Sequence, residues 1–228
     1  MALVLDGDNG IVGVLATNTD GDVIFDTNTL FVDAVENKVG IGTITPVRQL
    51  HLASSVPSIR LEDTDVSGAY NDIVHLSTGE LSIRVDHGNV QSNSSLSFLI
   101  DADEKMRIDT DGNVGIGVTP NAGWSANNKV LDFGYHGSVS TDGDGTKFGM
   151  NMAMNAYAIG GADPSSWKYK TNSAYHASLY HQTAGSHNFY VTDDTASTDA
   201  AISWTPAMTI DNAGKVGIGE TDPDSTLT

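Results

Sequence analysis

The chain has 228 residues and carries 29 acidic against 11 basic side chains, so its formal net charge is −18 at pH 7. The basic residues form no stripe, which argues against nucleic-acid binding and against docking on anionic membranes, because both need clustered Lys or Arg. The absence of cysteine excludes a disulfide framework, a thiol nucleophile and thiolate metal sites. No segment predicts membrane insertion, and the N-terminus has no basic leader typical of a signal peptide.

Turn-forming residues interrupt the sequence throughout and predict an all-β fold. There are 24 Gly, with many Asn-Gly, Asp-Gly and Thr-Asp pairs, and 39% of the residues are hydrophobic. This hydrophobic content argues against disorder, and no window keeps a helical apolar period beyond about three turns. Residues 150–159 are the best helical candidate, yet their apolar side chains alternate in a way that suits a strand.

In chain order, residues 1–29 come first, with short apolar runs at 3–5 and 11–15 that Asp-Gly turns separate. This segment is too small to fold alone. Residues 30–52 are the first copy of a repeat, with a strand at 30–33, Asn-Lys-Val-Gly-Ile-Gly, a proline and an alternating strand at 49–52. The spacer that follows contains further strand-like runs, at 58–61, 73–76, 81–85 and 96–100.

The phrase Val-Gly-Ile-Gly occurs three times, at 39–42, 114–117 and 216–219, and a proline follows each copy within four residues. The second and third copies come after similar strands, at 106–109 and 208–211. A strand, an Asp- and Gly-containing turn and a return strand predict a β-hairpin. Because a unit of this size cannot bury a core alone, its recurrence predicts a stacked or multi-chain β architecture.

Each hairpin is expected to have two unlike faces. In the second copy, Val114 and Ile116 lie on the face expected to be buried, and Gly115 and Gly117 lie on the opposite one. Glycines on one face indicate that another backbone approaches closely. Since a lone hairpin is marginal in water, a symmetry mate or a neighbouring sheet must cover the apolar face. The predicted core of a parallel homotrimer comprises Val39, Ile41, Val114, Ile116, Val216 and Ile218.

Residues 121–207 contain all three Trp and six of the seven Tyr. Large rings suit both β cores and sugar faces, and packing is the expected role of any single ring. Sugar binding adds fixed polar groups in a shallow concavity, and Asn172, Ser173, Gln182 and Ser186 fall in or near expected turns. The candidate glycan-binding residues are Trp167, Tyr169, Tyr175, Tyr180 and His181. His181 and His187 would share a strand face only without a turn between them, and residues 184–186 predict a turn.

Other chemistry is sparse, and we predict no catalytic residue, no metal site, no cofactor and no enzymatic activity. The sequence contains no Gly-x-Ser-x-Gly elbow and no His-Glu-x-x-His. In the Asp-rich turns at 109–113 and 142–145, glycine is misplaced for a calcium loop and no downstream Glu follows, so turn chemistry is expected rather than cation binding. No pair among the 29 acids is singled out for glycoside hydrolysis.

The predicted organisation is an N-terminal segment at 1–29, the first hairpin repeat at 30–52, a β spacer with the second repeat at 53–120, the aromatic module at 121–207 and the third repeat at 208–228. The phrases at 30–52, 106–117 and 207–219 resemble the repeat of bacteriophage tail fibre and tailspike proteins. Segments at 167–170, 189–191 and 202–205 resemble a module that lies between such repeats. In many members a self-cleaving intramolecular chaperone domain follows the last repeat, so a C-terminal continuation, or an end on a partner, is expected.

The resemblance implies an elongated, homotrimeric β-structured fibre on the virion tail that mediates or supports host-cell attachment. Residues 1–29, which are similar to fibre N-termini, would attach it to the tail or another virion protein, and a host surface glycan is the expected ligand. Two other functions stay open. A polysaccharide-degrading tailspike would need a groove with two facing carboxylates. A bacterial surface adhesin, or a virion adaptor or decoration protein, would be favoured by a secretion signal or a monomeric fold.

Overall fold

The computed structural model describes residues 22–25, 29–141, 149–160, 166–171 and 174–224. Nearly all regular structure in these ranges is β-strand, so the predicted all-β class is confirmed. The chain divides into two compact units, Met1–Gln91 and Ser92–Thr228. The division falls inside the predicted spacer at 53–120, and the second repeat therefore belongs to the same unit as the aromatic module and the third repeat.

The first unit contains a four-stranded and a three-stranded sheet. The four-stranded sheet has the order β1-β2-β3-β4, in which β3 and β4 are parallel and the other pairs are antiparallel. The three-stranded sheet is an antiparallel meander, β5-β6-β7. The strands are β1 (Val23–Phe25), β2 (Leu30–Asp33), β3 (Lys38–Ile41), β4 (Leu50–Leu52), β5 (Ser58–Asp63), β6 (Ala69–His75) and β7 (Leu81–Arg84).

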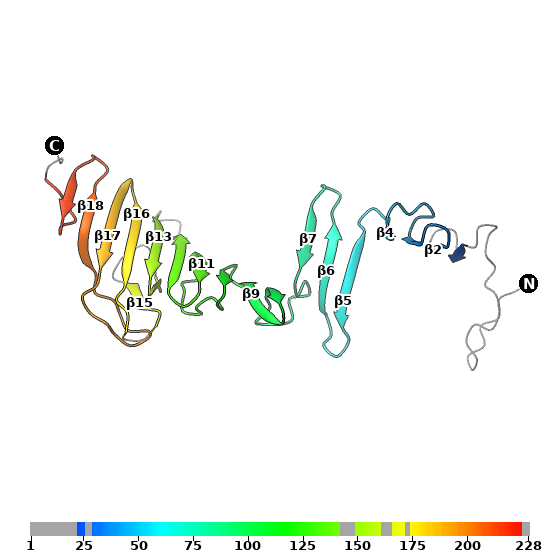
Figure 1. The fold of residues 1–228 in the computed structure, drawn as a ribbon, viewed down its shortest axis with the longest axis horizontal. Coiled ribbons are helices and arrows are strands. Elements are labelled where there is room, and N and C mark those ends of the chain that lie inside the picture. Colours follow the sequence, from blue (N-terminus) through cyan, green and yellow to red (C-terminus); the bar gives the residue numbers. More distant parts are fainter. Residues whose placement is uncertain (1–21, 26–28, 142–148, 161–165, 172–173, 225–228) are drawn as a thin grey trace, which may run out of the picture. The chain divides into compact units, whose positions relative to one another are not determined.

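The second unit is built on a ten-stranded sheet with the order β19-β18-β17-β16-β13-β12-β11-β10-β9-β8 (Figure 1). A separate two-stranded sheet pairs β14 (Ala156–Ala158) with β15 (Trp167–Tyr169). The strands of the large sheet are β8 (Leu96–Ile100), β9 (Asp103–Ile108), β10 (Val114–Ile116), β11 (Lys129–Phe133), β12 (Gly137–Thr141), β13 (Gly149–Met154), β16 (Ser178–Thr183), β17 (Ser186–Val191), β18 (Thr205–Ile210) and β19 (Val216–Ile218).

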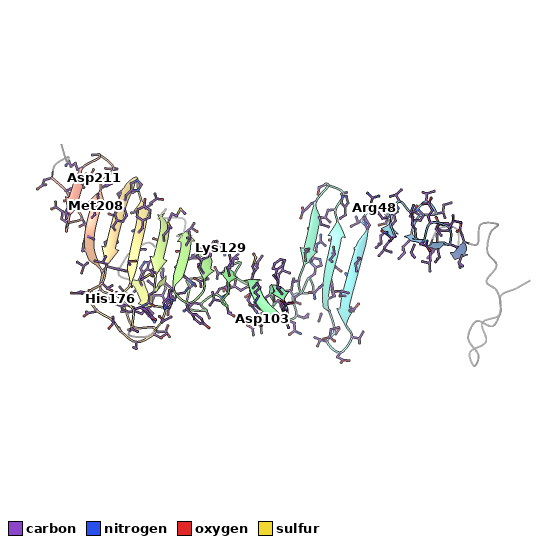
Figure 2. The ribbon with its side chains drawn as sticks, viewed as in Figure 1. Arg48, Asp103, Lys129, His176, Met208 and Asp211 are labelled. Atoms are coloured by element: carbon purple, nitrogen blue, oxygen red, sulfur yellow. The ribbon has the colours of Figure 1, made fainter. Side chains whose placement is uncertain are left out.

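All three repeats form the predicted hairpins, β2-β3, β9-β10 and β18-β19. The turn of the second repeat is closed by Asp109, whose Oδ1 accepts hydrogen bonds from the backbone N–H groups of Asp111 (3.0 Å) and Asn113 (2.8 Å). Asp211, labelled in Figure 2 just after β18, makes the same two bonds in the third repeat, to Ala213 (2.9 Å) and Lys215 (2.8 Å). The expected turn chemistry is confirmed here; the second Asp-rich turn, at 142–145, lies outside the described residues.

The first glycine of each Val-Gly-Ile-Gly phrase is buried against the chain that follows it. A Cβ at Gly40 would lie 2.2 Å from the backbone oxygen of Thr43, and one at Gly115 would lie 2.0 Å from that of Val118. Only a residue without a side chain permits this return of the backbone. The predicted close approach of backbone to the glycine face is confirmed, and the approaching backbone is that of the same chain.

After this return, the first and second repeats each add a parallel strand. Val39 pairs with Leu50 in β4, and Val114 pairs with Leu131 in β11. The carbonyl oxygen of Ile41 accepts a hydrogen bond from the N–H of Ala53 at 2.8 Å. In these two repeats the proline after the phrase lies between one strand and the next, consistent with its inability to continue a central ladder.

In the described part of the single chain, the isoleucine side chains of the phrases are exposed and the valine side chains are half-buried; the predicted burial of this face between copies stays a prediction. Ile41, Ile116 and Ile218 are 44%, 44% and 71% exposed. The returning backbone covers the glycine face instead, and successive side chains of a strand point to opposite faces.

Candidate functional site

The candidate functional site is an interface: the open face of the ten-stranded sheet in the second unit. Residues that face one another across the strands form one continuous row, because each strand is in register with the next. The row contains no charged side chain and crosses the sheet from β8 to β19. Its members are Leu96, Ile108, Val114, Leu131, Val139, Met152, Tyr180, Phe189, Met208 and Ile218.

Rows on either side extend this open face. One flanking row consists of Phe98, Met106, Ile116, Phe133, Gly137, Met154, Ser178, Val191 and Thr205. The other runs through Lys129, Thr141, Met150, Gln182, His187, Ile210 and Val216. Apart from Lys129 of β11, these rows contain no Asp, Glu, Lys or Arg, although the chain has a net charge of −18. The acidic side chains are therefore absent from these three rows of the open face.

Exposure on this face is high for apolar side chains. Met150, Met152 and Met154 alternate along β13 and are 46%, 53% and 48% exposed. Met106 and Met208 lie on the same face, so every methionine except Met1 gathers there (Met208 is labelled in Figure 2). A contiguous uncharged apolar surface of this kind marks a contact with another protein, and flexible methionines adapt well to such contacts.

The three-stranded sheet of the first unit has the same imbalance. Ile59, Ile73 and Ile83 are cross-strand neighbours and are 42%, 45% and 55% exposed. The opposite face of β6 holds the buried Asp72, whose carboxylate accepts hydrogen bonds from Arg60 at 3.0 and 3.4 Å. Arg60 also lies 3.7 Å from the ring centroid of Tyr70. Each unit thus exposes an apolar sheet face.

The other side of the ten-stranded sheet, the covered face, holds the hydrophobic core of the second unit. Here β14 and β15 pack with Val130, Ala153 and Leu179 of the large sheet. Trp167 makes edge contacts with the rings of Trp124 and Trp204, with centroids 6.2 Å apart in both cases. These aromatic side chains therefore build a core, in the role expected of each single ring.

A buried ion pair joins this covering layer to the sheet. Lys170 Nζ lies 2.7 Å from Asp132 Oδ1, and their side chains are 4% and 0% exposed. The second oxygen, Oδ2, accepts hydrogen bonds from Trp124 Nε1 at 3.2 Å and from the N–H of Asn121 at 3.1 Å. Every oxygen of the buried carboxylate is thus satisfied, which is the condition under which a buried charge is tolerated.

Two titratable groups on the covered side have shifted pKa values. Burial, together with a 2.6 Å hydrogen bond to Asp199, raises the pKa of the Tyr157 hydroxyl far above its ordinary value. Burial alone lowers the pKa of His181, so the imidazole is held neutral.

The predicted glycan-binding set needs correction at three positions. Trp167, Tyr169 and His181 are only 1%, 2% and 3% exposed, because they point to the covered face or into the layer above it. None of them presents a ring face to solvent for a sugar. Sequence periodicity identified the strands but could not indicate which of the two faces the distant β14 and β15 would cover.

The remaining two members of the set lie at the surface, on different elements. Tyr175 is 50% exposed and makes an edge contact with His136, with ring centroids 4.7 Å apart. Tyr180 lies on the open face, stacked against Phe189 at 4.8 Å and against His187 at 6.0 Å. The structure thus does not bring the five predicted residues together. Asn172 and Ser173 lie outside the described residues.

The turn predicted at 184–186 separates the two histidines. Thr183 pairs with Ser186, and Ala184 and Gly185 take positive φ angles of 49° and 82°. His181 consequently faces the covered side and His187 the open side. The sequence analysis did not single out His187 or the methionines of β13 as interface residues, although their alternation in the strands was a usable signal.

Within the described ranges, no cluster of three or more His, Asp or Glu side chains is arranged to hold a metal ion. The same part of the chain contains no helix with the length and apolar character needed to cross a membrane. The segment predicted to attach to the virion, 1–29, lies largely outside the described residues. A scan against models of protein families found no match, and a search of curated proteins found no similar sequence.

Proposed function

We propose that this chain is a structural, non-enzymatic subunit of a homotrimeric virion fibre, located on a phage tail, that supports attachment to the host cell. The observation that carries the proposal is the uncharged apolar row that crosses all ten strands of the open face. A soluble monomer rarely leaves such a surface in water. The resemblance of the three repeats to tail fibre repeats supplies the biological setting.

Self-association explains the placement of charge better than a foreign partner does. Copies of a chain with a net charge of −18 repel one another except where the surface is neutral. The exposed isoleucines of the three-stranded sheet place a second neutral apolar surface in the first unit. A foreign partner would have to match both surfaces, whereas identical copies in parallel bring like surfaces together.

The oligomer can be tested with one charge placed on the open face. Met152 is 53% exposed, so Met152→Lys should leave the single chain folded but put a charge at the centre of the contact. We expect this variant to sediment as a monomer with an unchanged circular dichroism spectrum. Asn127→Lys adds the same charge on an exposed loop before β11 and should sediment like the wild type. Assembly of both variants to the same extent would refute the proposed interface.

Virion location needs a separate experiment. Antibodies raised against the purified chain should place gold label on the tails of particles from the source phage, and deletion of residues 1–29 should abolish incorporation. Normal occupancy after the deletion would reject that segment as the attachment point. Label found only outside particles would reject the virion role.

Of the residues predicted to bind a glycan, only Tyr175 is both exposed and outside the open face, so we propose that it contributes to glycan recognition. Tyr135 is 74% exposed on the neighbouring turn, and the intervening His136 contacts Tyr175. Exposed rings of this kind can stack on sugars. Alanine substitution of both tyrosines should reduce binding of the oligomer to host cells. Unchanged binding with an intact oligomer would place recognition elsewhere.

A further inference from the structure

On the open face, Tyr180, Gln182 and His187 form a hydrogen-bonded polar cluster. We propose that this cluster sets the register and the number of copies in the assembly, by hydrogen bonding to the same cluster in a second copy of the chain. The inference rests on the proposed function, because it takes the open face to be the contact between copies.

The hydrogen bonds within the cluster indicate which of its atoms donate and which accept. Gln182 Nε2 donates to the Tyr180 hydroxyl at 2.7 Å, and that hydroxyl lies 2.6 Å from His187 Nδ1. Gln182 Nε2 also lies 3.4 Å from His187 Nδ1. An amide N–H and a phenol O–H both lie within hydrogen-bond distance of this ring nitrogen, so in this proposal Nδ1 is taken as the acceptor and the ring proton is placed on Nε2.

This arrangement leaves a donor and an acceptor unused. In the described part of the chain, His187 Nε2–H and Gln182 Oε1 make no hydrogen bond. The other polar atom of each side chain, His187 Nδ1 and Gln182 Nε2, is hydrogen-bonded to the Tyr180 hydroxyl. The ring of Tyr180 is itself held in place, stacked between His187 and Phe189 with interplanar angles of 15° and 24°. The free donor and acceptor are therefore orientated before any copy arrives.

A hollow next to the cluster provides space for a group from another chain. It has a volume of about 640 Å3, and its wall includes Met150, Gln182, Ser186 and His187. The apolar part of this wall continues the rows of the open face, whereas Gln182 and His187 provide its polar part. A second copy that presents the same surface brings both an apolar side chain and a hydrogen-bonding partner.

The donor and the acceptor make the cluster complementary to itself. In a ring of copies related by rotation, His187 Nε2–H of each copy can donate to Gln182 Oε1 of the next one, and the last bond closes the ring. The cluster contains no carboxylate, so this contact adds no repulsion between the acidic chains. A second copy is therefore the occupant that the cluster fits best.

The cluster discriminates between arrangements because unmade hydrogen bonds are costly in a dry contact. A shifted register would bury His187 Nε2–H and Gln182 Oε1 against methionine or isoleucine. The apolar rows alone would tolerate such a shift, because their neighbours are similar in size and chemistry. A single polar position inside an apolar contact is a known means of fixing register and copy number.

The test compares variants by native mass spectrometry and sedimentation at the same micromolar concentration. The double variant Gln182→Leu/His187→Leu keeps the apolar contact but removes the donor and the acceptor. We expect it to assemble into a mixture of species, whereas the wild type gives one. His187→Gln can still accept from Tyr180 through its oxygen and donate through its nitrogen, so it should restore a single species. Thr141→Val, a polar change in the same row outside the cluster, should leave one species.

Folding of each variant is checked by circular dichroism and by hydrogen exchange in β16 and β17. If the double variant folds and forms the same single oligomer as the wild type, the inference is overturned while the proposed function stands. If the wild type is itself a folded monomer, the proposed function fails and the inference fails with it. A mixture in the double variant, together with a single species in His187→Gln, supports the cluster as the determinant of register.

Discussion

At the residue scale, Gly115 shows how one missing side chain directs the path of the backbone. A Cβ there would lie 2.0 Å from the carbonyl oxygen of Val118 and 2.9 Å from Cδ of Pro120. Both atoms belong to the segment that leads from β10 towards β11. At Gly217 the nearest atom is Cγ of the Glu220 side chain, at 2.6 Å, and the nearest backbone atom, the oxygen of Glu220, lies farther away at 3.1 Å.

This difference predicts unequal effects of the same substitution. Gly115→Ala should lower the free energy of unfolding by about 1–3 kcal/mol or more, because the backbone return is forced open. Gly217→Ala should change it by less than about 1 kcal/mol, since displacement of the Glu220 side chain is offset by the lower entropy of the unfolded chain. Denaturant unfolding at matched protein concentration measures both, and equal losses would contradict this account of the repeat.

His181 predicts a pH dependence of stability. Burial lowers its pKa in the folded chain below the value of an unfolded histidine, near 6.5. The folded state therefore binds the proton less readily than the unfolded state. The contribution is fully present above the unfolded pKa and is lost as the pH falls from there through the lowered folded pKa.

Thermal unfolding between pH 7.5 and pH 5 should therefore show a fall in stability that His181→Gln reduces. His187→Gln, on the open face, is the matched control. It should show the part of the fall in stability that His181 causes, as the wild type does. An equal fall in the wild type and in His181→Gln would show that burial of this imidazole is not responsible.

At the scale of elements, Lys170 connects the segment after β15 to β11 through Asp132. Lys170→Met should lower the free energy of unfolding by about 3–5 kcal/mol, because it leaves a buried carboxylate without its cation. The double variant Lys170→Met/Asp132→Asn should recover most of this loss, since a neutral amide oxygen still accepts from Trp124 and Asn121. Chemical denaturation distinguishes the two, and a double variant as unstable as the single one would contradict the account.

The sequence predicted elements well where the signal was local. Alternation and turn residues located the three hairpins, and the runs at 58–61, 73–76, 81–85 and 96–100 correspond to β5, β6, β7 and β8. The close approach at Gly115 followed from the absence of a side chain on one strand face. These features depend on residues only a few positions apart.

The faces could not be predicted, because they depend on distant segments. Trp167 is buried since β14 and β15 pack over one side of the large sheet, and no local pattern indicates which side that is. Because the sequence does not show which face is covered, His181 and Tyr169 were predicted to bind sugar. For the same reason the open face was not predicted, since its apolar row can be traced only when the register of ten strands is known.

At the scale of the whole molecule, each unit leaves an apolar sheet face without cover in the described chain. In the second unit the row from Leu96 to Ile218 includes residues of the second and third repeats and of the aromatic module alike. The second and third repeats are therefore parts of one surface. Three copies around an axis would bury this surface from solvent, with a gain of about 25 cal/mol for each Å2 of apolar area removed from water.

The most direct test of the central claim is the mass of the assembled chain in solution, measured by sedimentation equilibrium at micromolar concentration and physiological salt. The proposed homotrimer predicts a single species with three times the 24.0 kDa of one chain. The mass should be unchanged on tenfold dilution, as expected for an extensive apolar contact. A well-folded species of 24.0 kDa under these conditions would contradict the claim.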